Sequence, residues 1–65
     1  MYVVNREDVV KLMTDYVENM NREIATSHGM DPNQLEMLIN QARPDLNRVN
    51  GELFDHLVER GVIRS

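Results

Sequence analysis

The chain has 65 residues, no cysteine, seven basic and eleven acidic side chains, and a formal net charge of −4. A domain of this length hides only about 60% of the surface that its unfolded form exposes. Without cysteine it has neither disulfides nor thiolate metal sites to compensate. We therefore expect one small domain over residues 1–65 that gains stability by self-association. The negative charge disfavours nucleic acid, and no apolar run reaches the roughly 20 residues of a membrane span, so we expect a cytoplasmic protein.

The first predicted element is a long amphipathic helix within residues 5–29. Asn5 is a good N-cap, and Gly29 stands where a left-handed C-terminal cap belongs. The apolar residues recur at spacings of three and four, which predicts one buried stripe along the helix. The residues of this stripe are Val10, Met13, Val17, Met20 and Ile24.

The second predicted helix covers residues 32–42. Asp31 is a suitable N-cap, Pro32 suits the first helical position, and Gln34 completes a capping box. Pro44 is expected to stop this helix, because proline lacks a backbone donor and restricts the residue before it.

The third predicted helix covers residues 46–60 and ends at Gly61 and Val62 in the pattern of a Schellman motif. Gly51 is costly inside a helix, so an alternative is that Asn50 caps a helix that starts later. The predicted fold is an all-α small domain of three helices, one long and two short. The sequence also allows a minimal strand pair between residues 2–4 and 62–64.

The last helix ends in Leu-Val-Glu-Arg-Gly-Val-Ile-Arg, residues 57–64. Together with the helix and turn before it, the segment of residues 34–64 resembles the second half of a winged helix-turn-helix domain, as in repressors of the multiple-antibiotic-resistance type. The resemblance implies that the third helix reads the major groove of DNA. Its candidate DNA-contacting residues are Asn47, Arg48 and Asn50.

The charge pattern favours a different function. On the outward face of the third helix, Glu52, Asp55 and Glu59 follow Arg48, and phosphate would repel these three carboxylates. We therefore predict a small acidic, non-enzymatic regulatory or adaptor protein that acts through protein–protein interaction, with DNA binding as the alternative.

Neither histidine predicts catalysis or metal binding. Asp55 and His56 are adjacent and point about 100° apart on a helix, and His28 lies in a loop with no thiol anywhere in the chain. Glu52 and His56 are four residues apart rather than the three of a di-iron helix motif. We expect no enzyme activity, no cofactor and no metal.

The expected partners are a second copy of the chain and another protein of unknown identity. The long helix outruns the two shorter ones, so part of its apolar stripe should pair with the same helix of a second copy. Met37, on the polar side of its helix, marks a further contact. The predicted dimer or partner interface consists of Val9, Leu12, Met13, Tyr16, Met20 and Met37.

Overall fold

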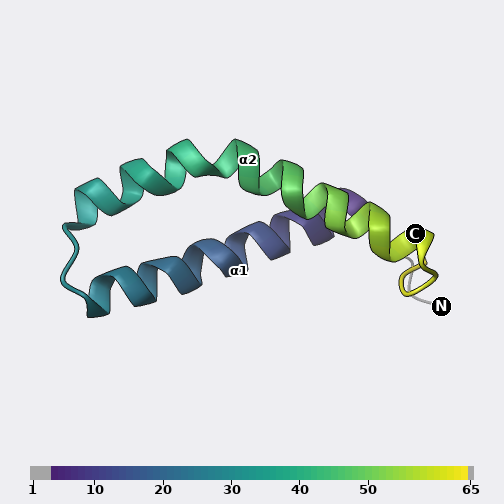
Figure 1. Cartoon of the computed structure of the whole chain (residues 1–65), viewed down its shortest axis with the longest axis horizontal. Helices are drawn as coiled ribbons and strands as arrows, with labels where there is room; N and C mark the ends of the chain where they lie inside the picture. Colours follow the sequence, from purple (N-terminus) through teal and green to yellow (C-terminus); the bar gives the residue numbers. More distant parts are fainter. Residues whose placement is uncertain (1–3, 65) are drawn as a thin grey trace.

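The computed structural model of the chain describes residues 4–64. Over that range it is an antiparallel hairpin of two helices, α1 (Arg6–Ser27) and α2 (Pro32–Glu59), joined by a short turn (Figure 1). The all-helical prediction is confirmed, but the three-helix prediction is wrong, because the second and third predicted helices are one element. Residues 4–64 contain no strand. Residues 2 and 3 of the expected strand pair lie outside the described residues.

Both ends of α1 follow the predicted capping. The Asn5 side-chain oxygen accepts hydrogen bonds from the backbone N–H groups of Glu7 at 2.9 Å and Asp8 at 3.3 Å. Gly29 is left-handed with φ +79°. Its N–H donates to the carbonyl of Thr26, and the Met30 N–H donates to that of Ala25, each at 3.0 Å. These two bonds form a Schellman motif, which stops α1 and turns the chain toward α2.

The start and the end of α2 are also as predicted. The Asp31 carboxylate accepts from the Gln34 N–H at 3.3 Å, and Pro32 opens the helix. At the other end Gly61 is left-handed, with φ +78°. The Val62 N–H donates to the Leu57 carbonyl at 2.9 Å in a second Schellman ending.

The prediction that Pro44 ends a helix is wrong, because α2 runs through it for 28 residues. Figure 1 shows α2 bending near its middle, as expected of a helix with an internal proline. Proline removes one backbone hydrogen bond. Arg43 before the proline and Asn47 after it both form hydrogen bonds to α1. These contacts keep both halves of α2 packed against α1. Tertiary contacts therefore override the local stop signal.

Gly51 lies inside α2 and is buried, so the alternative start at Asn50 is also wrong. A Cβ atom at Gly51 would lie 2.6 Å from Nη2 of Arg6. The arginine crosses over this glycine to reach Asp55. Glycine is therefore needed here for a close approach of α1 rather than for a turn.

The interior between the helices is small and contains both apolar and polar side chains. Its buried apolar residues are Leu35, Ile39 and Phe54, all from α2. The predicted stripe of α1 lies along the edge of this interior rather than in its centre. Its first three residues are half-buried, whereas Met20 is 41% exposed and Ile24 is 52% exposed. In the single chain the stripe is therefore only partly buried, as expected if part of it pairs with a second copy.

The hairpin forms a single layer. Its extents are 43 × 20 × 16 Å and its radius of gyration is 14.3 Å, against about 11 Å for a compact chain of this length. One layer of two helices leaves both broad faces open to solvent, and the character of these two faces differs.

Replacing Pro44 tests the continuity of α2. Pro44→Ala should restore a backbone hydrogen bond inside the helix and raise the free energy of unfolding by about 1 to 3 kcal/mol. Urea denaturation followed by circular dichroism measures this. Pro32→Ala at the first turn is the matched control, and it should have little effect. An unchanged or lower stability of Pro44→Ala would indicate a turn at residues 43–45 instead.

Candidate interaction surface

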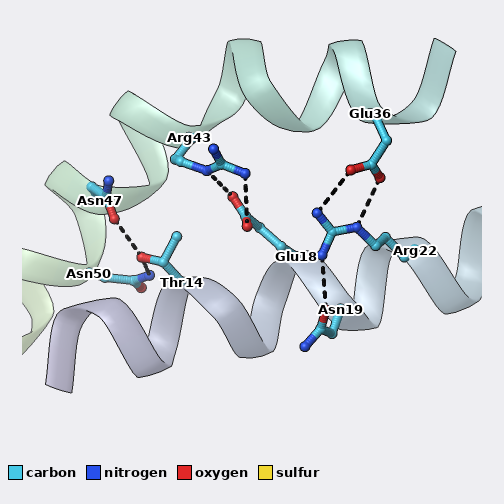
Figure 2. Close-up of polar contacts among 8 residues, drawn as sticks. All are labelled: Thr14, Glu18, Asn19, Arg22, Glu36, Arg43, Asn47 and Asn50. Atoms are coloured by element: carbon cyan, nitrogen blue, oxygen red, sulfur yellow. Dashed lines mark hydrogen bonds and ion pairs between the residues drawn. The ribbon is translucent and has the colours of Figure 1, made fainter. Parts of the chain in front are cut away.

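A partly buried hydrogen-bond network crosses the middle of the hairpin. The Thr14 hydroxyl donates to Oδ1 of Asn47 at 2.8 Å, and Nδ2 of Asn50 donates to the Thr14 hydroxyl at 3.0 Å (Figure 2). Thr14 and Asn50 are buried. We call these three residues the threonine network. Because the hydroxyl both donates and accepts, it fixes α1 and α2 at one relative position.

Ion pairs extend this polar contact along the helices. The buried Glu18 carboxylate accepts from Nε of Arg43 at 2.8 Å and from Nη2 at 3.3 Å (Figure 2). Hydrogen bonding to Glu18 raises the pKa of the Arg43 guanidinium above its usual value. This pair lies one turn from Thr14 along α1, so most of the buried face of α1 is polar.

Two exposed ion pairs lie toward the ends of the hairpin. Arg22 forms two hydrogen bonds to Glu36, at 2.9 and 3.1 Å, and Arg6 forms two to Asp55, also at 2.9 and 3.1 Å. The hydrogen bonds from the arginines hold the pKa of each carboxyl, Glu36 and Asp55, below its usual value. Two-point contacts of this kind fix orientation as well as charge.

One broad face of the hairpin is polar and contains a groove of about 780 Å³. Eight charged side chains line it, four positive and four negative. Lys11, Asp15 and Glu18 contribute from α1, with Arg43 and Arg48 from α2. The charges balance within the groove, so it has no strong preference for an anion or a cation.

The other broad face is apolar. Near the turn it contains a groove of about 500 Å³ whose lining includes Ile24 from α1 and Leu35, Leu38 and Ala42 from α2. Apolar residues continue away from this groove along both helices at spacings of three and four, on α2 with the half-buried Leu46 between Ala42 and Val49. We call this surface the apolar face. It comprises Met13, Val17, Met20 and Ile24 of α1 and Leu38, Ala42, Val49 and Leu53 of α2.

The predicted interface residues fall in three places. Met13 and Met20 belong to the apolar face, and the half-buried Val9 lies at its edge. Leu12 and Tyr16 lie on the outer side of α1, where they are 68% and 69% exposed. Met37 is 59% exposed on the outer side of α2.

Sequence reasoning missed the part of the apolar face that comes from α2. Leu38, Val49 and Leu53 are each close to half exposed. Their spacing was a visible signal, but a division into two short helices assigns them to an internal core. Only a continuous α2 places all three along one open face.

The candidate DNA-contacting residues are mostly engaged within the hairpin. Asn47 and Asn50 belong to the threonine network and point toward α1. Arg48 is exposed and donates to Glu52 at 3.2 Å. The structure thus brings the two asparagines together around Thr14, where Asn50 is buried, and leaves Asn47 and Arg48 exposed.

The histidines lie apart, at opposite ends of the hairpin. Nδ1 of His28 is 2.8 Å from the Ile24 carbonyl oxygen, so it serves to close the last turn of α1. His56 lies in the last turn of α2. Within residues 4–64 no group of three His, Asp or Glu side chains could hold a metal ion. No helix in the same range is long and apolar enough to cross a membrane.

Removing the Thr14 hydroxyl should destabilise the hairpin. Thr14→Val keeps the shape but leaves the buried Asn50 amide without its acceptor, which costs about 1 to 3 kcal/mol of unfolding free energy. The double variant Thr14→Val/Asn50→Leu should recover most of this loss, because both partners are then apolar. Urea denaturation measures both. Thr26→Val, at an exposed position of α1, is the control, and a loss equal to that of Thr14→Val would contradict the network's role.

The exposed ion pairs predict a dependence of stability on acid. A carboxyl whose pKa is lower in the folded state stabilises that state above its unfolded pKa, near 4, and this contribution is lost as the pH falls through the lowered value. The stability of the wild-type protein should therefore decline below about pH 4. Asp55→Asn/Glu36→Gln should be less stable at pH 7 and should decline less between pH 5 and pH 2.

Low-salt thermal melts across this pH range measure the effect, since salt screens exposed pairs. The charge-matched control is Asp45→Asn/Glu23→Gln. In the described part of the chain, neither of these two exposed carboxylates forms an ion pair with an arginine. Equal acid dependence in both double variants would count against the two arginine pairs.

Comparison of the chain with protein families, with characterised proteins and with solved structures finds no match. The most prominent feature of the hairpin is the contrast between a charge-balanced polar face and an open apolar face.

Proposed function

We propose that this chain is a small, acidic, non-enzymatic adaptor or regulator of the cytoplasm that acts through protein–protein contacts, with a homodimer as its working form. The observation that carries the proposal is the apolar face, which both helices build and which α1 and α2 leave open. Contiguous exposed apolar surfaces on small proteins mark contacts with other macromolecules.

The exposed area of the chain supports association. The hairpin exposes 5210 Å², whereas a compact monomer of 7.6 kDa exposes about 4,300 Å². The excess of about 900 Å² resembles the roughly 800 Å² that each partner buries in a standard protein interface. Burying a surface of that size would bring the chain to the exposure of an ordinary compact protein.

The distribution of charge supports a second copy as the molecule on the apolar face. The residues that define the face are all uncharged, and the ion pairs of the hairpin involve other positions. Two copies can therefore meet through this face without bringing like charges together, despite a net charge of −4 on each. Two hairpins stacked in this way form a two-layer, four-helix bundle.

This dimer differs from the one expected from the sequence, which pairs chiefly through the helix that is now α1. Leu38, Val49 and Leu53 place half of the apolar face on α2, so the proposal assigns both helices to the contact. An isologous pairing of the whole face also gives the small interior of Leu35, Ile39 and Phe54 a larger shared core.

The DNA-binding alternative has less support. It needs Asn47 and Asn50 to reach base edges, and both are engaged in the threonine network. A gel shift with duplex DNA at low salt examines this alternative directly. Retarded DNA with the wild-type chain that is lost in Arg48→Ala would favour it over the adaptor function.

Sedimentation equilibrium at micromolar concentration tests the homodimer. We expect a mass near twice 7.6 kDa. Leu53→Glu and Met20→Glu, one on each helix, should each shift the mass toward that of a single chain, because an unpaired charge in an interface is costly. Met37→Glu, an exposed methionine outside the apolar face, is the matched control and should leave the dimer intact.

A melting temperature that rises with protein concentration would independently support the dimer, since association stabilises the folded form. This second measurement remains informative if a variant loses its fold when it dissociates. A single-chain mass for the wild type across the concentration range would refute the homodimer. A loss of the dimer in Met20→Glu but not in Leu53→Glu would restrict the contact to α1.

A further inference from the structure

The outer side of α1 carries an apolar pair separate from the apolar face. Leu12 and Tyr16 are 68% and 69% exposed. They are four residues apart and therefore adjacent on the helix surface. Each is two residues from the buried Thr14, or about 200° around the helix, so both point away from α2. A second copy that covers the apolar face would leave this pair in solvent.

Three acidic residues border the pair. Asp8 lies one turn before Leu12, Asp15 precedes Tyr16, and Glu23 lies two turns after Tyr16. The ion pairs found within residues 4–64 occupy other carboxylates, those of Glu18, Glu36, Glu52 and Asp55. Within the described residues Asp8, Asp15 and Glu23 therefore form no ion pair, although Asp15 also lines the polar groove. We call Asp8, Leu12, Asp15, Tyr16 and Glu23 the acidic ridge.

We infer that the acidic ridge docks a basic amphipathic helix of a partner protein. The apolar residues of such a helix, spaced three and four apart, would pack on Leu12 and Tyr16. Its flanking lysines or arginines would meet Asp8, Asp15 and Glu23. The Tyr16 ring also offers a face to a cation and a hydroxyl to a hydrogen bond.

Charge separates this partner from other classes. A second copy would bring an identical acidic ridge, and nucleic acid or an anionic membrane would bring phosphates; the three carboxylates would repel each of these. A basic helix instead gains electrostatic steering from the same groups. The inference rests on the proposed function in that the chain acts by protein contact, but it uses residues outside the apolar face.

Fluorescence anisotropy with two labelled model peptides tests the inference. One is an 18-residue helical peptide with leucines spaced three and four apart and lysine at the polar positions. The other has the same leucines with glutamate in place of lysine. We expect the lysine peptide to bind at least about tenfold more tightly than the glutamate peptide, with an affinity that falls as salt is added.

Variants of the chain locate the site. Leu12→Ser/Tyr16→Ser should weaken binding of the lysine peptide by about tenfold or more, and Asp8→Asn/Asp15→Asn/Glu23→Gln should remove most of the preference for lysine over glutamate. Met37→Ser, at an exposed apolar position on α2, is the control and should bind as the wild type does. Circular dichroism of each variant checks that the helices are retained.

Equal binding of the two peptides, or unchanged binding by Leu12→Ser/Tyr16→Ser, would overturn the inference. Dissociation of the dimer in that same variant would also overturn it, because the pair would then lie inside the dimer contact. Sedimentation separates this test from that of the homodimer. A single-chain wild type that still binds the lysine peptide through Leu12 and Tyr16 would refute the homodimer and support the ridge.

Discussion

The hairpin depends on the hydrogen bonds of one hydroxyl group. Thr14 donates to Asn47 and accepts from Asn50, two residues about one turn apart on α2. Both bonds form only at one relative position of the two helices along their axes, because the hydroxyl has a single proton to donate. Any other position would leave a buried polar group unpaired, which is costly. The adjacent Glu18–Arg43 pair requires the same position.

This polar contact explains why so much apolar surface is open. Thr14 and Glu18 occupy the side of α1 that meets α2, so the methionines and Ile24 are displaced to one edge of the contact. The matching residues of α2 lie beside them around the groove near the turn. A hairpin that is joined by polar groups and is apolar on one broad face is suited to association, and it gives the proposed adaptor two distinct surfaces, the apolar face and the acidic ridge.

Capping signals in the sequence predicted where α1 begins and ends and where α2 begins and ends. Asn5, Asp31, Gly29 and Gly61 act through bonds to residues within a few positions of themselves, so their effect does not depend on the rest of the fold. The exposed state of Met37 also followed from local pattern, because a residue opposite the apolar stripe of its helix faces solvent wherever the helix packs.

What the sequence by itself determined was therefore the all-helical character, the capped ends of the helices and the exposure of Met37. Only the tertiary structure decided that Pro44 and Gly51 lie inside α2, because contacts from Glu18, Thr14 and Arg6 compensate their local cost. It also decided that Asn47 and Asn50 bond to Thr14 of α1 and that Leu38, Val49 and Leu53 stay open. These outcomes depend on how α1 and α2 are placed against each other, through contacts between residues 25 or more positions apart that local helix rules do not describe.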